Sequence, residues 1–269
     1  MKSAKKFIGT IILTLLVLCI LLPLLTILVW VVTERWTWPS LIPQTFSLRS
    51  VKAVLRDGKE LTGLFVSSVG ISFVVAALSV IIGLLTSRAL ELYDFIGKKA
   101  FSFLALLPFL VPGTVFAMGV QVTFIKLGLS GTVPGVVIAH LICSLPYAVI
   151  LLQDGTKALG NRLEEQARVL GASARQAFFK VTLPNLLPVM LSAFSMAYII
   201  SFSQYFLTLM IGGGSVKTFT IVMVPYIQSS ERNFASIYSL IFLVLTILIF
   251  GLFEWLVKRL SRDQEVEYY

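Results

Sequence analysis

The sequence Glu165-Gln166-Ala167-Arg168-Val169-Leu170-Gly171 is followed, after nine further residues, by Val181-Thr182-Leu183-Pro184. This polar segment lies between two apolar stretches, and each is long enough for a membrane-spanning helix, which needs about 20 apolar residues. It contains residues that favour helix ends, among them a glycine, which indicates short, well-bounded helices. The segment therefore predicts a structured loop at the surface of a membrane protein.

The composition of the whole chain agrees with that interpretation. Hydrophobic residues make up 57% and charged residues 13% of the sequence, against about 25% charged residues in soluble domains. The net charge is +9, but the basic residues lie at the ends of apolar stretches, which favours a membrane over nucleic acid as the partner. Cys19 and Cys143 both lie inside apolar stretches, so we expect neither a disulfide framework nor a zinc site.

Six stretches without charged residues are long enough to be spans. They are Phe7–Val32, Leu61–Ser87, Ala100–Ile125, Leu127–Gln153, Val181–Val216 and Asn233–Phe253. The fifth exceeds one span, so we expect its helix at about Leu186–Leu209 and an outer loop at Ile211–Ser215, where three glycines disfavour a helix. The sequence thus predicts an all-α, polytopic membrane protein with six transmembrane helices.

Charge predicts the orientation of these spans. With the N-terminus inside, 14 of the 22 Lys and Arg residues lie on the inner side, as the positive-inside rule requires. Both termini and the segment Asp154–Pro184 are then expected to be cytoplasmic. We expect three parts: residues 1–60 with the first helix and an outer loop, a five-helix core at 61–256 that includes the loop 154–184, and a cytoplasmic tail at 257–269.

Two short helices are predicted within Asp154–Pro184. Asn161 is a good N-cap for a first helix at Arg162–Leu170, and Glu164 completes a capping-box-like pair with it. Gly171 is expected to end this helix in a left-handed conformation. Ser173 would cap the second helix with Gln176 as its reciprocal partner. Such a pair of capped helices would be a rigid projection, able to transmit force.

The residues Glu165, Ala167, Gly171, Leu183 and Pro184 match the spacing of the EAA loop of ABC-importer permeases, with Gln166 where that pattern usually has Ala. The chain therefore resembles the binding-protein-dependent permease family. Further likeness to its spermidine/putrescine-type branch lies in Leu107-Pro108-Phe109-Leu110-Val111-Pro112-Gly113, Ala139-His140 and Leu145-Pro146-Tyr147. The resemblance implies the type I ABC importer (MetI-like) permease fold.

In that family the loop docks in a groove of an ATPase subunit. The resemblance implies docking roles for Glu165, Ala167 and Gly171, with Leu183 and Pro184 fixing the return to the membrane. It also implies a second permease subunit, expected to be a different chain, two ATPase subunits and an extracytoplasmic solute-binding protein, in the bacterial cytoplasmic (inner) membrane. The sequence has no Gly-x-x-x-x-Gly-Lys-Ser/Thr, so we expect ATP and Mg²⁺ on the partner ATPase, and no enzymatic activity, cofactor or metal in this chain.

Several polar residues in the spans are candidates for the translocation path. They are His140 in the fourth span and Ser201, Gln204, Tyr205 and Thr208, which would share one face of a continuous helix in the fifth. Hydrogen bonding between helices is the alternative role for all of them. In the third span Pro108, Pro112 and Gly113 are expected to kink the helix, either to line a cavity or only to distort packing.

The substrate is open at this stage. The resemblance favours spermidine or putrescine, yet no carboxylate lies in the interior of the six spans to bind a polycation. Thiamine, ferric iron, phosphonate and sulfate-type anions are alternatives. A membrane scaffold or signalling subunit that only anchors an ATPase is an alternative of another class. An intramembrane enzyme is disfavoured, because the spans contain no pair of ionisable residues placed to form a catalytic site.

Overall fold

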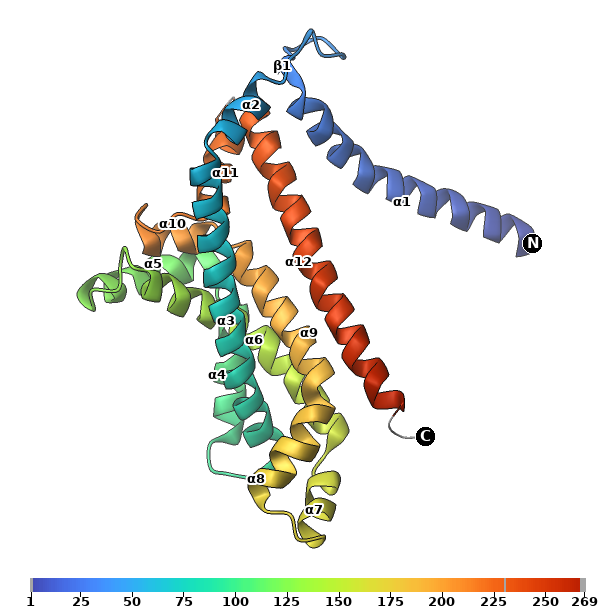
Figure 1. The fold of residues 1–269 in the computed structure, drawn as a ribbon, viewed down its shortest axis with the longest axis vertical. Coiled ribbons are helices and arrows are strands. Elements are labelled where there is room, and N and C mark those ends of the chain that lie inside the picture. The colour runs from blue at the N-terminus through green and yellow to red at the C-terminus, as the bar shows by residue number, and fades with distance from the viewer. Residues whose placement is uncertain (1, 230, 267–269) are drawn as a thin grey trace. The chain divides into compact units, whose positions relative to one another are not determined.

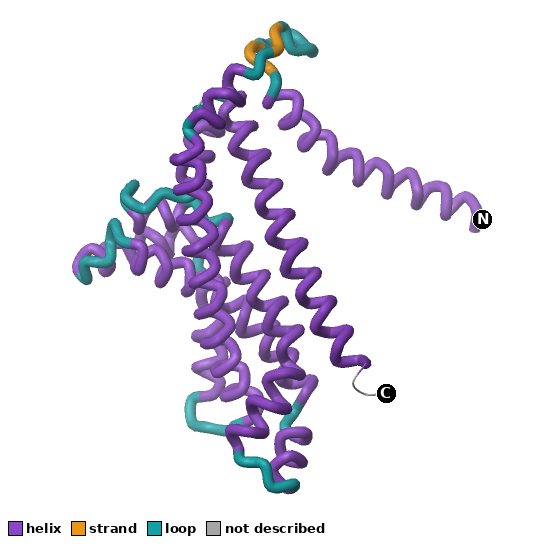
Figure 2. Tube along the Cα trace, viewed as in Figure 1, coloured by secondary structure: helices purple, strands orange, loops and turns teal. Residues whose placement is uncertain are grey.

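The computed structural model describes residues 2–229 and 231–266, which form helices and one short β-hairpin (Figures 1 and 2). The helices are α1 (Lys2–Val31), α2 (Arg49–Arg56), α3 (Gly58–Leu92), α4 (Lys98–Leu110), α5 (Gly113–Lys126), α6 (Val133–Leu159), α7 (Arg162–Val169), α8 (Ala174–Ala177), α9 (Leu183–Phe202), α10 (Phe206–Gly212), α11 (Phe219–Gln228) and α12 (Arg232–Val266), with a π-helical turn, η1, at Phe178–Thr182. The strands β1 (Thr33–Arg35) and β2 (Thr45–Phe46) pair antiparallel.

The predicted all-α, polytopic membrane fold is confirmed. Among the described residues, five helices are long and apolar enough to cross a membrane, and α4 with α5 gives a sixth span if the bent pair is counted as one. Met1 and Glu267–Tyr269, at the ends of the predicted cytoplasmic segments, lie outside the described residues. The chain divides into two compact units, one formed by Met1–Gly63 and Val222–Leu245, the other by Leu64–Ile221 and Thr246–Tyr269.

The first unit joins the ends of two long helices through the hairpin. The Trp36 ring stacks on Trp30 at the end of α1, with centroids 5.1 Å apart. The Arg232 guanidinium at the start of α12 lies 5.3 Å from the centroid of Trp30, and the Asn233 amide donates to the carbonyl oxygen of Thr33. The sequence predicted only an outer loop for this segment, so the hairpin and α2 are additions to the prediction.

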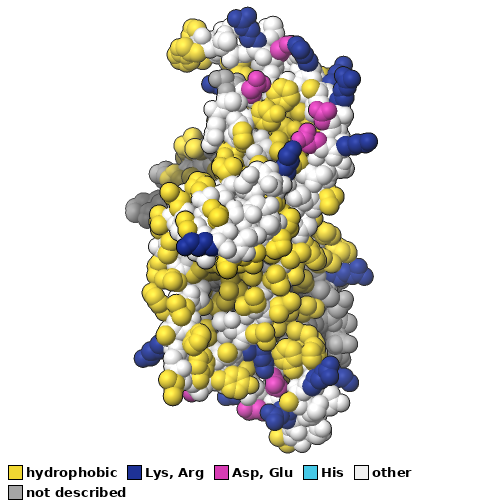
Figure 3. Space-filling model, turned by 90° about the vertical axis from the view of Figure 1, so that its left-hand side faces the viewer, with side chains coloured by type: hydrophobic (Ala, Val, Ile, Leu, Met, Phe, Trp, Pro, Cys, Tyr) yellow, Lys and Arg dark blue, Asp and Glu magenta, His cyan; other side chains and the backbone are white. Residues whose placement is uncertain are grey.

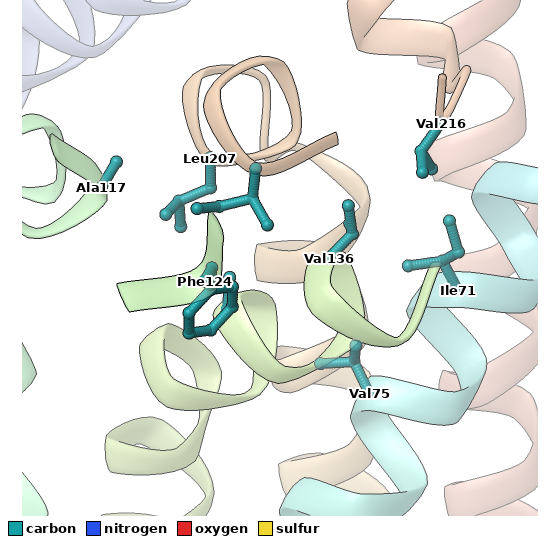
Figure 4. Packing of buried hydrophobic residues seen from close by; sticks show 9 residues of the cluster. Ile71, Val75, Ala117, Phe124, Val136, Leu207 and Val216 are labelled. Atoms are coloured by element: carbon teal, nitrogen blue, oxygen red, sulfur yellow. The ribbon is translucent and has the colours of Figure 1, made fainter. Parts of the chain in front are cut away.

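The second unit has two apolar clusters. One joins α3, α5, α6 and α10, and Figure 4 shows Phe124 and Leu207 lying close together beside Val136. The other joins α3, α6 and α9 and consists of Val80, Leu84, Ala148, Leu152, Leu186 and Ala193. Helices α6 and α9 approach closely at Gly155, where an added Cβ would lie 2.9 Å from Val189. Small residues at such contacts are typical of membrane helices, which gain stability from close packing.

The third predicted span, Ala100–Ile125, is a sharply broken pair of helices. The chain bends by 107° between α4 and α5, and the break lies at Val111 and Pro112. Proline lacks an amide donor and forces the preceding residue away from helical backbone, and Val111 is indeed extended. Gly113 begins α5, whereas Pro108 lies inside α4. The bend therefore coincides with two of the three residues expected to kink this span.

The fifth predicted span also differs from the structure. The helix expected at Leu186–Leu209 ends at Phe202, and α10 continues to Gly212, into the predicted loop Ile211–Ser215. Gly213 and Gly214 then adopt φ angles of +54° and +79° and end α10. The prediction of one continuous helix was wrong because residues 203–205 leave the helical path.

Figure 3 shows how side chains are distributed on one face. Hydrophobic side chains cover the helical middle, and Lys and Arg side chains gather with acidic ones at the end that carries α7 and α8. A charged end beside an apolar surface is the pattern that a bilayer selects.

Candidate functional site

The loop between α6 and α9 is ordered by local hydrogen bonds around Gly171. Helix α7 ends at Val169, and Gly171 has a φ angle of +94°. The Gly171 N–H donates to the Arg168 carbonyl at 3.0 Å, and the Ala172 N–H donates to the Ala167 carbonyl at 3.0 Å. These two bonds form a Schellman motif, in which a left-handed glycine satisfies the last carbonyls of a helix. The left-handed conformation predicted for Gly171 is confirmed.

The second helix of the loop is capped as predicted. The Ser173 hydroxyl accepts from the Gln176 N–H at 3.3 Å, and the Gln176 side chain accepts from the Ser173 N–H at 2.9 Å. Helix α8 then continues through the wide turn η1 into α9. Pro184 lies in the first turn of α9, a position that tolerates proline, and so marks the start of that helix.

The predicted capping box at the start of α7 is wrong. The Asn161 side chain makes no cap hydrogen bond to the backbone. Its amide donates instead to the Glu165 carboxylate at 2.8 Å. The Glu164 carboxylate, expected to reach back to Asn161, points into the protein and binds residues from two other segments.

Glu164 lies in a partly buried cluster of polar groups. Its Oε2 accepts from the Arg88 guanidinium of α3 at 2.9 Å and from the Thr182 hydroxyl at 2.8 Å. The Arg88 and Glu164 side chains are only 13% and 14% exposed. Burial raises the pKa of Glu164, but hydrogen bonds from Thr182 and Arg88, with the charges of Arg88 and Arg168, outweigh it and hold the pKa below its usual value. The carboxylate is therefore ionised at neutral pH.

The opposite face of α7 has few contacts within the chain. Val169 and Leu170 are 87% and 88% exposed, although both are apolar. Together with Arg162, Glu165 and Gln166 they line an open hollow of about 530 Å³. Sequence reasoning did not include Arg162 or Val169 among the docking residues. For Val169 a signal was present, because it forms an apolar pair with Leu170 at the end of a short polar helix.

The remaining residues predicted to dock or to fix the loop have different surroundings. Glu165 and Gly171 are exposed, and Ala167 is half-buried. Leu183 packs against the apolar cluster of α3, α6 and α9. Glu165 and Gly171 thus belong to the accessible surface of the loop, whereas Leu183 anchors its return to the bundle.

Three of the residues predicted for the translocation path form one buried cluster. The two ring nitrogens of His140 lie 3.0 Å from the Ser201 hydroxyl and 2.9 Å from the Thr208 hydroxyl. All three side chains are at most 2% exposed within the chain. The cluster therefore ties α6 to the end of α9 and to α10, across the break between them.

Gln204 and Tyr205 lie in the break and are half-buried. The Gln204 carbonyl accepts from the hydroxyls of Thr208 and Thr220, at 2.9 Å each. Because α9 ends at Phe202, the four residues predicted to share one face do not lie on a single helix. Ser201 and Thr208 are nonetheless brought to the same site, since each hydroxyl lies against a different ring nitrogen of His140.

A family model for the binding-protein-dependent transport system inner membrane component matches residues 2–262. The chain belongs to this family. As a member of it the chain is an importer permease, a multi-pass protein of the inner membrane, and the family is one of permease subunits, not of ATPases.

Curated permeases resemble this chain with different named substrates. A spermidine/putrescine transport system permease protein, PotC of Haemophilus influenzae, is 26% identical over 72% of this chain and 76% of its own length. A molybdate/tungstate permease protein, WtpB of Pyrococcus furiosus, is 28% identical over 81% and 86% of the two chains. A 2-aminoethylphosphonate permease protein, PhnV of Salmonella typhimurium, is 24% identical over 90% of each.

Solved structures support the same fold. A chain of a bacterial ABC transporter that imports the polysaccharide alginate superposes with a TM-score of 0.65, at 14% identity over 96% of each chain. A chain of the MetNI methionine transporter in an inward-facing conformation gives a TM-score of 0.61, at 16% identity over 74% of this permease and 95% of that chain. The type I importer permease fold implied by the sequence is therefore confirmed.

Proposed function

We propose that this permease forms half of a solute pathway and receives force from an ATPase subunit through the loop 154–184. The observation that carries the proposal is the asymmetry of α7. One side is held to the bundle through Glu164, and the other presents Val169 and Leu170 to solvent beside Glu165. A rigid helix with an open apolar and acidic face is suited to docking into a groove of another subunit.

The proposed assembly contains a second permease subunit of different sequence, two ATPase subunits with ATP and Mg²⁺, and an extracytoplasmic solute-binding protein. Family membership supports this set of partners. ATP and the loaded binding protein would each bind one conformation of the paired permeases more tightly, and that difference in affinity drives the alternation. The outer segments 33–60 and 211–232 are the proposed contact for the binding protein.

Glu165→Ala is expected to weaken association with the ATPase. The carboxylate is exposed in this chain, and in the proposed complex it pairs with a basic residue of the groove. Removing one member of a desolvated pair costs about 2–5 kcal/mol, against about 0.2–1 kcal/mol for an exposed pair. Co-purification of the ATPase subunit measures the loss. Asp94→Ala is the matched control, because it removes a fully exposed carboxylate between α3 and α4, outside the hollow. Equal co-purification of both variants and the parent would contradict the charge pair.

Both termini and the loop 154–184 are proposed to be cytoplasmic, because basic residues concentrate there. In a variant without Cys19 and Cys143, single cysteines are placed at Ala174 in the loop and at Ser215 after α10; both positions are exposed. A membrane-impermeant thiol reagent is expected to label position 215 in whole cells, and position 174 only after lysis. Labelling of position 174 alone in whole cells would reverse the orientation.

A polyamine, spermidine or putrescine, is the proposed substrate. Similarity to PotC over 72% of this chain supports it. An oxyanion is the second candidate, because relatives named for molybdate/tungstate, sulfate and phosphonate match comparable shares of the chain. The predicted spans contain no carboxylate in their interior, so in this proposal the solute-binding protein recognises the polycation.

Uptake by a strain lacking this gene tests the function and separates the candidates. Labelled putrescine, spermidine, molybdate, sulfate, 2-aminoethylphosphonate and thiamine are supplied one at a time, with and without the restored gene. ATP-dependent polyamine uptake that returns with the gene is expected. Uptake of an anion or of thiamine instead would replace the substrate, and ATPase association without any uptake would favour a scaffold.

A further inference from the structure

Three segments of the chain meet at one carboxylate oxygen. Arg88 lies near the inner end of α3, Glu164 lies on α7 and Thr182 lies on η1 at the start of the fifth span. Both the guanidinium of Arg88 and the hydroxyl of Thr182 donate to Oε2 of Glu164. The first of these bonds joins residues 76 positions apart, and the second joins residues 18 apart.

The cluster is also protected and oriented by an aromatic ring. The Arg88 guanidinium lies 5.0 Å from the centroid of the Phe178 ring, and Phe178 packs against the apolar cluster of α3, α6 and α9. The planar guanidinium of Arg88 is therefore held by two groups, the Phe178 ring and the Glu164 carboxylate. A charge pair held this way is screened far less by water and salt than a surface pair.

An exposed ion pair of this chain makes a useful comparison. Lys258–Glu254 has side chains 74% and 51% exposed, and its members lie four residues apart on one helix. Such an exposed pair contributes little to stability and links residues of one helix only. Arg88–Glu164 differs from this pair because it links two helices and because its side chains are largely shielded from solvent.

We propose that Arg88, Glu164 and Thr182 are positioning residues that hold α7 at a fixed angle to α3 and to the start of the fifth span. A displacement of α7 then moves both helices together and is not absorbed by bending of the loop. The fixed position of α7 is a property of this chain alone, whereas its effect on transport rests on the proposed function.

Distances between spin labels test the geometry. Labels are attached to cysteines at Leu85 on α3 and Val169 on α7, which are 64% and 87% exposed, in the full chain without its native cysteines, in lipid nanodiscs. The parent is expected to give one narrow distance distribution. Glu164→Gln and Arg88→Gln are each expected to broaden it at least twofold, Thr182→Val less. The exchanged pair Arg88→Glu with Glu164→Arg is expected to narrow it again.

Glu254→Gln makes the same chemical change in the exposed pair and is expected to leave the width of the distance distribution unchanged.

The width is also expected to depend on pH. Since the pKa of Glu164 is lowered, the narrow distribution is present above the usual carboxyl pKa and is lost as the pH falls through the lowered value. Glu164→Gln should show no such pH dependence. An unchanged width in Glu164→Gln and Arg88→Gln, or no recovery in the exchanged pair when all variants are monodisperse, overturns the proposal.

The transport consequence is measured on the complex with its ATPase, using the solute identified by the uptake panel. Glu164→Gln is expected to retain ATP hydrolysis and to raise the ATP consumed per solute at least fivefold. If the variants broaden the distance distribution but the parent permease transports none of the solutes, the proposed function is contradicted and the positioning role remains. If the Glu164→Gln and Arg88→Gln variants keep a narrow distance distribution and normal uptake, only the positioning role is contradicted.

Discussion

Gly171→Val is expected to abolish uptake while the permease still inserts and still reaches the membrane. Gly171 has a φ of +94°, and no heavy atom lies within 4 Å of a Cβ built there. The substitution therefore causes no steric clash, and its cost comes from the backbone conformation. For a residue with a Cβ that cost is about 1 kcal/mol or more. A β-branched residue is expected to leave the left-handed region and to break both bonds of the Schellman motif.

The result would be a changed angle between α7 and α8, with ATP hydrolysis no longer coupled to solute. Uptake and hydrolysis are measured on the same reconstituted complex. Gly128→Val is the matched control, because Gly128 has a φ of +68° and equally open surroundings, but lies between α5 and α6. Gly171→Asn should recover part of the uptake, since asparagine tolerates this conformation. Equal uptake by Gly171→Val and the parent would remove the role of the turn.

Leu170→Asp is expected to prevent association with the ATPase without affecting the fold of the permease. The Leu170 side chain is 88% exposed, so its replacement should change stability by no more than about 0.5 kcal/mol. In the proposed complex the same side chain is buried, and full burial of a leucine contributes about 1.5–3 kcal/mol. A buried aspartate without a partner adds a desolvation cost to that loss.

Ile96→Asp is the control for this change. Ile96 is a fully exposed residue at 102% in the segment between α3 and α4, and its replacement should leave association intact. Co-purification of the ATPase and the thermal midpoint of the permease alone are measured for both variants. An ATPase that co-purifies equally with Leu170→Asp and the parent would mean that this end of α7 is not in the interface.

Local sequence patterns predicted the parts of the loop that are determined locally. Gly171 ends α7, and Ser173 with Gln176 caps α8, because each of these arrangements involves residues at most five positions apart. The same reasoning failed at Asn161 and Glu164. Arg88, which binds Glu164, is 76 residues away, so no local pattern could show that this carboxylate was already engaged.

The break after Phe202 was also decided by distant residues. Pro188 lies near the start of the predicted helix 186–209, and residues 189–209 contain no proline or glycine, so periodicity alone predicts one helix through the break. In the structure the carbonyl of Gln204 is held by Thr220 of α11, and His140 of α6 binds a hydroxyl on each side of the break. The polar residues of the span were found from sequence, but their arrangement required the other helices.

The wide turn at Phe178–Thr182 resets the rotational phase between the loop and the fifth span. A π-helical turn adds one residue to a helix, and one residue corresponds to about 100° of rotation in an α-helix. The turn thereby sets the phase of α9 relative to α8, so that Thr182 reaches Glu164 and Leu186, one turn later on the same side of the helix, packs in the apolar cluster of α3, α6 and α9. Deleting a single residue from this turn would preserve every helix of the permease and yet rotate the whole of α9 against the loop.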